Sequence, residues 1–241
     1  MVTNNDKYGI LYLIPTPLNE EEGFDKLPLY VVERVHKLNY FVVERAKTAR
    51  HFVKRCNHPS PISALFFTEL NEHTPKPEIK ELMKPLLDGH DVGLMSEAGC
   101  PAVADPGSEL VALCHRHGIE IRPLIGPSSI LLGLMASGMN GQQFTFHGYL
   151  PNKRPELAPA LKKIEQRILS QRDTHIFIEA PYRNNMLFEM LLQTLHDDIK
   201  LCIAKDLSSD SEWIKTLPIS GWKRYNHPDF HKVPIIFILG V

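Results

Sequence analysis

Residues 94–110 read LMSEAGCPAVADPGSEL, and this stretch decides the fold. A short apolar run ends at Ser96, a turn rich in glycine and proline follows, and Glu109 lies near the start of a helical pattern. An apolar strand that leads through a turn into a helix is the building unit of a parallel α/β sheet. In such sheets, ligands bind beyond the carboxyl ends of the strands, so this turn is a candidate binding loop.

Strands and helices alternate on both sides of this stretch. Apolar runs predict strands at 9–14, 39–43, 62–67, 91–96 and 119–125, and helical spacing predicts helices at 28–38, 46–56 and 78–88, the last kinked by Pro85. Asp105 is expected to cap the next helix, with Pro106 as its first residue. After Gly141, strands at 144–150 and 175–180 enclose a basic helix at 155–172. We therefore predict two α/β domains, residues 1–125 and 126–241, each with a mainly parallel or mixed sheet flanked by helices.

The composition excludes several classes of protein. No apolar run reaches the roughly 18–20 residues that span a bilayer, and the first residues lack the pattern of a secretory signal. The four cysteines are widely separated, which favours reduced thiols. We expect a cytoplasmic protein without membrane association or a metal site. The net charge is −1, so RNA binding would depend on a local basic patch rather than on an overall basic field.

Three turns follow predicted strands, at 15–17, 96–101 and 126–129. Glycine lets a ligand approach the backbone closely, and nearby N–H groups can bind carboxylate or hydroxyl oxygens. None of the turns carries a Walker phosphate loop, a dinucleotide fingerprint or a G-x-S-x-G nucleophile elbow. Cys100 lies in the central turn, but Pro101 follows it and no activating base stands beside it in the sequence. The residues alone leave open whether the turns bind a ligand or only connect strands to helices.

Seven segments in sequence order resemble the S-adenosylmethionine-dependent tetrapyrrole methylase-like superfamily. SEAGCPAVADPG resembles its SDAGTPGISDPG signature, GILYLIPTPL a first strand that ends in a T-P turn, and IGPSSILLGLMASG the I-P-G-P-S-A turn and helix. FHGYLPNKRPE resembles F-x-G-F-L-P-x-K, and IFIEAPYRNN resembles a strand followed by E-S-P-H-R. VVERAKTAR and FFTELNE resemble A-E-D-T-R-x-x-R and Y-H-E-H-N-E of the bacterial 16S ribosomal RNA (cytidine-2′-O)-methyltransferase branch.

The resemblance implies a two-domain fold that binds S-adenosylmethionine in the cleft between the domains, and a homodimer. Methyl transfer needs an in-line approach of the acceptor, which is largely a matter of positioning, and no covalent enzyme intermediate. Carried over position by position, the resemblance places the methyl donor against ten residues: Pro17, Ser96, Glu97, Ala98, Gly99, Val103, Ser128, Ser129, Leu150 and Pro181.

The sequence departs from the branch mainly on the acceptor side. The Gly-Asn after the first T-P turn is missing, and E-D-T-R is replaced by Glu44-Arg45-Ala46-Lys47, although Arg50 is retained. Both histidines of Y-H-E-H-N-E are replaced, by Thr68 and Leu70. In the central turn, Glu97 replaces aspartate. We infer that methyl-donor binding is kept, whereas the altered motifs leave the acceptor open.

Four residues are candidates for a catalytic or acceptor-orienting role: Glu44, Lys47, Arg50 and Glu69. The first three either orient the acceptor or bind phosphate, or they form a solvated, salt-bridged helix start. Glu69 is either a general base or a structural cap or ion-pair partner. The basic helix at 155–172 either guides RNA or is a solvated face, because acidic residues lie among its cations. Trp213 and Trp222 either stack on bases or pack in a core or dimer contact.

The main functional prediction is a methyltransferase that uses S-adenosylmethionine and acts on a ribose 2′-hydroxyl of ribosomal RNA or the small ribosomal subunit. One alternative is a methyltransferase for a tetrapyrrole or another small molecule, which the near-neutral charge and altered acceptor motifs favour. The other is a protein that binds the donor but has lost catalysis.

Overall fold

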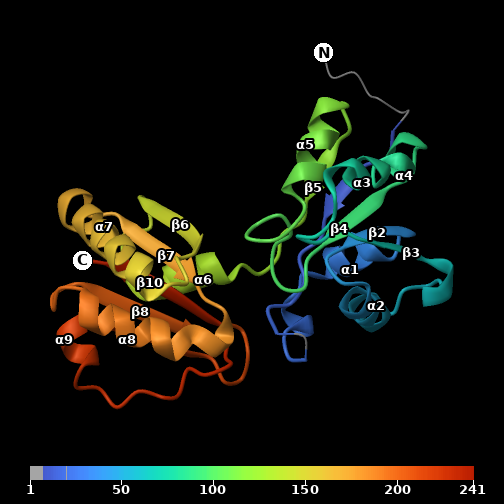
Figure 1. Cartoon of the computed structure of the whole chain (residues 1–241). Coiled ribbons are helices and arrows are strands. Elements are labelled where there is room, and N and C mark those ends of the chain that lie inside the picture. Colours follow the sequence, from blue (N-terminus) through green and yellow to red (C-terminus); the bar gives the residue numbers. More distant parts are fainter. Residues whose placement is uncertain (1–7, 20) are drawn as a thin grey trace. The chain divides into compact units, whose positions relative to one another are not determined.

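The computed structural model describes residues 8–19 and 21–241, which divide into two compact units, Met1–Ser128 and Ser129–Val241 (Figure 1). Each unit contains one five-stranded sheet with helices on it. The predicted two-domain α/β class, with one parallel and one mixed sheet, is confirmed.

The sheet of the first unit is entirely parallel, in the order β3-β2-β4-β1-β5. Strand β1 pairs with β4 on one side and with the edge strand β5 on the other, so that Leu11 lies opposite both Val92 and Ile121. The carboxyl ends of all five strands therefore meet along one edge. The strands are β1 (Leu11–Leu13), β2 (Tyr40–Val43), β3 (Phe66–Glu69), β4 (Val92–Met95) and β5 (Ile121–Pro123).

Helices cover both faces of this sheet, because its strands are apolar on both sides. Tyr12 packs with the core under α1 and α2, and its neighbour Leu11 packs with the core under α3, α4 and α5. Gly93 leaves room for this packing, since a Cβ there would lie 2.5 Å from Ile14 Cδ1. The helices are α1 (Leu29–Val35), α2 (Ala46–Arg55), α3 (Lys76–Glu81), α4 (Lys84–Leu87) and α5 (Ser108–Arg116), with short 3₁₀ helices η1 (Phe24–Lys26) and η2 (Ile62–Ala64).

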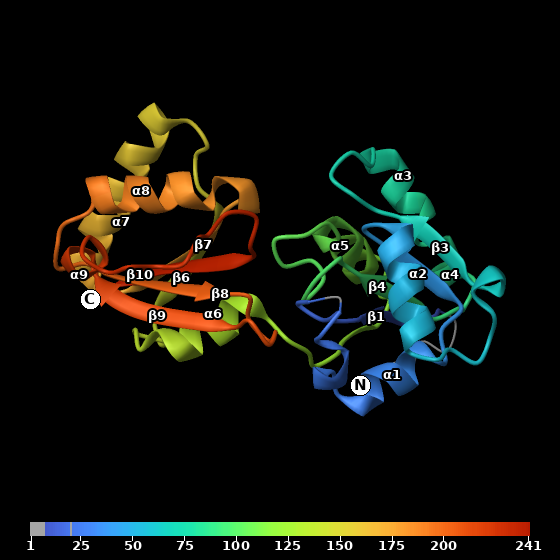
Figure 2. The same ribbon diagram turned by 90° about the horizontal axis from the view of Figure 1, so that it is seen from below.

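The sheet of the second unit is mixed, in the order β6-β7-β10-β8-β9, with β6 and β7 parallel and the other pairs antiparallel. Figure 2 shows α7 and α8 on one face of this sheet and α6 on the other. Its strands are β6 (Phe144–Tyr149), β7 (Thr174–Ile178), β8 (Lys200–Lys205), β9 (Trp213–Pro218) and β10 (Ile235–Gly240). Its helices are α6 (Ser129–Ser137), α7 (Arg154–Gln171), η3 (Pro181–Arg183), α8 (Asn184–Thr194) and α9 (Ile219–Trp222).

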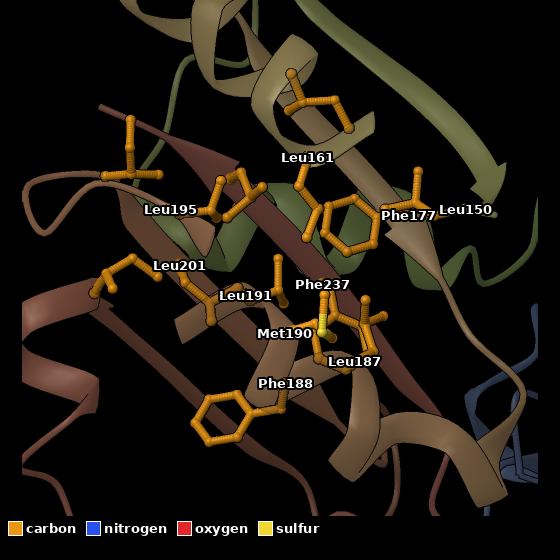
Figure 3. Close-up of a cluster of buried hydrophobic side chains, with 14 of the residues drawn as sticks. Leu150, Leu161, Phe177, Leu187, Phe188, Met190, Leu191, Leu195, Leu201 and Phe237 are labelled. Atoms are coloured by element: carbon orange, nitrogen blue, oxygen red, sulfur yellow. The ribbon is translucent and has the colours of Figure 1, made fainter. Parts of the chain in front are cut away.

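A single large core lies beneath α7, α8 and α9. Phe177 of β7 and Phe237 of β10 stack at 5.8 Å between ring centroids and face the α8 residues Leu187 and Leu191 (Figure 3). Trp222 is 1% exposed, and its indole Nε1–H donates to the carbonyl of Leu201 at 2.8 Å. Trp222 is therefore a core residue, which agrees with the interpretation of core packing and not with that of base stacking.

A polar chain crosses the α7 side of this unit. Arg167 Nη2 lies 2.8 Å from Asp173 Oδ2, and Asp173 Oδ1 lies 2.9 Å from His175 Nε2. His175 Nδ1 in turn lies 2.7 Å from Nε2 of His147, and the two rings are stacked. Asp173 and His175 are buried. Both carboxylate oxygens of Asp173 and both ring nitrogens of His175 have a hydrogen-bond partner in this network.

Three local predictions are wrong. Residues 62–64 form η2 rather than a strand, because Pro61 begins a tight 3₁₀ turn, and β3 starts only at Phe66. The predicted kinked helix at 78–88 is two short helices, with Pro85 in the first turn of α4. Asp105 and Pro106 lie in a turn before α5, whose N-cap is Gly107.

Candidate functional site

The three predicted turns of the first unit contact one another at the carboxyl edge of its sheet. Thr16 and Gly99 exchange two backbone hydrogen bonds, with N···O distances of 2.9 and 3.1 Å, and the Thr16 hydroxyl donates to the carbonyl of Ser96 at 3.3 Å. The third turn joins them at Pro127, whose carbonyl accepts from the Cys100 thiol at 3.5 Å. Gly126 touches Pro15 so closely that a Cβ would lie 2.2 Å from its ring. The backbone of three separate chain segments therefore forms one surface.

The central turn has an unusual backbone. Gly99, Ala102, Ala104 and Gly107 all have positive φ angles, of 77°, 65°, 62° and 131°. An alanine in the left-handed region costs about 1–2 kcal/mol, and such strain concentrates at functional sites. Val103, between the two alanines, is 47% exposed although it is apolar. The loop thus presents backbone groups and an apolar side chain outward, which suits a ligand with both polar and apolar parts.

The candidate residues Glu44 and Glu69 both accept hydrogen bonds from backbone N–H groups. Glu44 Oε2 accepts from the backbone N–H of Glu97 at 3.0 Å, and Glu69 Oε1 accepts from the N–H of Ala46 at 2.8 Å. Glu97 also contacts Thr48, at 3.3 Å between Oγ1 and Oε1. The Glu69 contact satisfies an amide at a helix N-terminus, which supports the capping role proposed for this residue. Glu44 ties the end of β2 to the central turn.

Asp105 has an unusual acid–base environment. Burial raises its pKa to about 6, the negative charge of Glu44 and the weaker one of Glu97 add to the rise, and a hydrogen bond with Ser96 opposes it. A carboxyl group with this pKa can exchange a proton near neutral pH, as a general base must. From the sequence, Asp105 was expected only to cap a helix, although its place in the DPG part of the central signature was a usable signal of a functional role.

A groove of about 560 Å³ lies beside Asp105. One wall is the segment after β3, including Asn71 and Glu72, and the other is the loop that contains Ala104 and Asp105. The segment that resembles an acceptor motif therefore faces the central turn across a groove. Thr68 does not belong to this groove, because it lines a different one between β3 and α4. Lys47 and Arg50 lie on the exposed side of α2.

The predicted donor residues of the second unit lie at one edge of its sheet. Leu150 follows β6 and Pro181 follows β7, and these two strands are parallel neighbours. The Leu150 side chain is 8% exposed and packs in the core, so its backbone is the part that can meet a ligand. Arg183 joins the two loops, since its Nη2 donates to the carbonyl of Asn152 at 2.6 Å.

A family model described as "Tetrapyrrole (Corrin/Porphyrin) Methylases" matches residues 27–220. The chain belongs to this family. It is 30% identical to the ribosomal RNA small subunit methyltransferase I of Vibrio cholerae, over 88% of this chain and 69% of the relative. It is 29% identical to the protein of the same name from Escherichia coli O157:H7, over 89% of this chain and 71% of that one.

Two solved structures of methyltransferases share the fold. The methyltransferase CobJ matches with a TM-score of 0.62 at 16% identity, over 97% of this chain and 93% of its own. The uroporphyrin-III-C-methyltransferase from Thermus thermophilus matches with a TM-score of 0.54 at 17% identity, over 96% and 92% of the two chains. At this identity the likeness shows the fold alone.

Membership in the tetrapyrrole methylase family makes this chain a methyltransferase that uses S-adenosylmethionine. Of the residues that the structure describes, no three histidines, cysteines or carboxylates are grouped as a metal site. No helix within residues 8–19 and 21–241 is long and apolar enough to cross a membrane.

Proposed function

We propose that this methyltransferase acts on the ribosomal RNA of the small subunit, with a ribose 2′-hydroxyl as the acceptor. The names of the relatives support the RNA substrate, and the chain covers 69% and 71% of the first two. The groove beside Asp105 carries the proposal on the structural side, because the acceptor-like segment and the central turn form its two walls. Its volume of about 560 Å³ is in the range of pockets that accept a small organic ligand such as a nucleotide.

The joined turns at the carboxyl edge fit a methyl donor. Backbone groups of Ser96, Glu97, Ala98 and Gly99 are suited to the amine and carboxylate of its methionyl part, and the exposed Val103 suits an apolar or ring surface. Pro17 is buried and lines a small pocket together with Thr16, Ser96 and Glu97. Contacts from Ser128, Ser129, Leu150 and Pro181 remain predictions from the family resemblance.

Asp105 is our candidate for the group that takes up the proton of the acceptor. S-adenosylmethionine supplies an electrophilic methyl group. As the hydroxyl oxygen bonds to that carbon and the carbon–sulfur bond breaks, the hydroxyl proton has to leave. Asp105 lines the groove, and its raised pKa of about 6 lets the carboxylate accept this proton and release it to solvent. Glu44 and Glu69 serve as structural supports in this scheme, because Glu44 holds the central turn and Glu69 holds the start of α2.

The same resemblance supports two further proposals, that the protein is a homodimer and that it works in the cytoplasm. A homodimer would place two sites in one particle, and size-exclusion chromatography with light scattering measures the mass directly.

The proposal is tested with donor that carries a labelled methyl group. The purified protein is incubated with small ribosomal subunits from a strain that lacks the corresponding activity, and in parallel with uroporphyrinogen. We expect label in the small-subunit RNA, at a nucleotide whose 3′ linkage resists alkali because its 2′-hydroxyl is methylated. Label in uroporphyrinogen alone would instead support the small-molecule alternative, and donor binding without any transfer would support loss of catalysis.

A further inference from the structure

Helix α2 has a continuous basic face. Lys47, Arg50, Lys54 and Arg55 lie within Ala46–Arg55, which contains no acidic residue. Residues three, four and seven positions apart share one side of a helix, so Lys47, Arg50, His51 and Lys54 line up on the same side. These four side chains are exposed, and Ala49, Phe52 and Val53 are buried on the opposite side. We call this set of four residues the α2 stripe; it extends over about 10 Å of helix.

The cations of the α2 stripe are not neutralised within the protein. Over residues 8–19 and 21–241, neither lysine nor Arg50 forms an ion pair with a carboxylate. The Arg50 guanidinium instead lies over the ring of Phe67, 5.4 Å from its centroid. A ring orients the guanidinium but leaves its N–H donors available for an oxygen ligand.

The α2 stripe begins at the central turn. Thr48 and Arg45, both at the start of α2, contact the carboxylate of Glu97, at 3.3 Å and 3.6 Å. Lys47 is therefore the end of the stripe near the candidate donor surface, and Lys54 is the far end. A polymer that places one unit at the central turn could lay its neighbouring units along this helix.

Helix α7 also carries several cations, but two of them are paired with carboxylates. Lys162 lies 2.7 Å from Glu165, and Arg167 lies 2.8 Å from Asp173. A basic composition alone therefore does not produce the unpaired row seen on α2. Because the net charge of the chain is only −1, the α2 stripe is a local positive surface and not part of a general one.

We propose that the α2 stripe binds consecutive phosphates of the RNA strand that carries the acceptor nucleotide. This inference rests on the proposed RNA substrate. It adds the path of the strand, which extends from the central turn along α2 toward Lys54. Phosphate is the group on a polynucleotide that recurs along its length and pairs with both lysine and arginine. The stripe fixes the register of the strand and does not select its sequence.

Lys54→Gln tests the inference, because Lys54 is the member of the stripe farthest from the central turn. The matched control is Lys163→Gln, which removes one exposed charge from α7. Binding of the full-length protein to a fluorescent single-stranded RNA is measured by anisotropy at a series of KCl concentrations. We expect Lys54→Gln to weaken binding at low salt and to reduce the slope of log affinity against log salt by about 0.7, the value for one phosphate contact on a single strand.

The outcomes separate this inference from the proposed function. Equal slopes for wild type, Lys54→Gln and Lys163→Gln, with small-subunit RNA still methylated, would overturn the stripe and leave the proposed function intact. A reduced slope for Lys54→Gln alone, without methylation of RNA by wild type, would support an RNA-binding stripe and reject the proposed acceptor. Calorimetric binding of S-adenosylmethionine should be unchanged in both variants, which shows that each is folded.

Discussion

Asp105 in the first unit is half-buried and Asp173 in the second is buried, and their neighbours carry opposite charges. Burial alone would raise the pKa of Asp173; hydrogen bonds and positive charge from His175 and Arg167 outweigh it and hold the pKa below its ordinary value. The pKa of Asp105 rises to about 6, because burial is reinforced by the carboxylates of Glu44 and Glu97. Ionised Asp173 therefore stabilises the second unit, whereas ionised Asp105 destabilises the first unit.

This contrast separates a structural ion network from a candidate site. The chain from Arg167 to His147 joins α7 to β7 and β6, and its groups satisfy one another. Around Asp105, the like charges of Glu44 and Glu97 lie beside a loop with two alanines at positive φ. Charge repulsion and backbone strain both destabilise the folded protein at this loop. Such local destabilisation is the pattern expected where a ligand binds.

The largest expected effect is at Asp173. Asp173→Ala leaves the buried His175 Nε2 without its partner, so we expect a loss of about 2–3 kcal/mol of unfolding free energy. Both tryptophans of the chain, Trp213 and Trp222, lie in the second unit, and their fluorescence during urea unfolding reports on this unit. Asp198→Ala is the control, because its side chain is 91% exposed, and it should change stability by less than about 0.5 kcal/mol.

The pH dependence of this effect has a definite sign. A carboxyl group whose pKa is lowered on folding stabilises the protein above its unfolded pKa of about 4, and the stabilisation is lost as the pH falls through the folded pKa. The difference between wild type and Asp173→Ala should therefore shrink in acid. A difference that stays constant down to the lowest pH at which both fold would show that charge is not the cause.

A smaller effect of opposite sign is expected at Asp105. Between its ordinary pKa of 3.8 and the folded value of about 6, the folded protein holds a proton that the unfolded chain has released. Stability therefore falls as the pH rises through this window and stays lower above it. Asp105→Asn keeps a polar group beside Ser96 without the charge, so we expect it to remove this fall.

The variant should be more stable than wild type above pH 6, by on the order of 1 kcal/mol after allowance for solvent screening. Hydrogen exchange of peptides from β4 measures this in the first unit. If Asp105 accepts the acceptor's proton, the methylation rate falls in the same variant. Lower stability than wild type at neutral pH would mean that Asp105 is a supporting ion like Asp173.

The smallest effect is expected at Ala104, whose φ is 62°. Ala104→Gly removes the strain of the left-handed conformation but raises the conformational entropy of the unfolded chain. The free energy of unfolding should therefore increase by only about 0.5 kcal/mol. Ala136→Gly, in α6, should instead destabilise by up to about 1 kcal/mol, because glycine is unfavourable in a helix. Hydrogen exchange in each unit compares the two, and equal losses would show that Ala104 is not strained.

Sequence reasoning identified the parts of the site that rest on short-range chemistry. The alternation of apolar runs with helical spacing predicted the α/β class, and the glycine and proline turns were placed at the edge where Thr16 meets Gly99. These inferences depend on neighbours in sequence or on a general rule for sheets.

Features of the site that depend on residues far apart in the sequence could not be predicted in this way. The residue types at positions 102 and 104 give no sign that Ala102 and Ala104 have positive φ angles. The charge environment of Asp105 comes mainly from Glu44, which follows β2 and is far from Asp105 in the sequence. The strand predicted at 62–67 was wrong because apolar content alone does not distinguish a 3₁₀ turn from an extended segment.

The position of β1 between β4 and β5 has a consequence for how the chain is made. On a ribosome, Leu11 emerges long before its partners Val92 and Ile121, so the first strand has no place in the sheet until most of the first unit has been synthesised. Such long-range pairing is slow and leaves apolar segments open to aggregation in the meantime. Nascent chains that stop before β4 should therefore depend on a chaperone, whereas those that extend past β5 can close the sheet around β1.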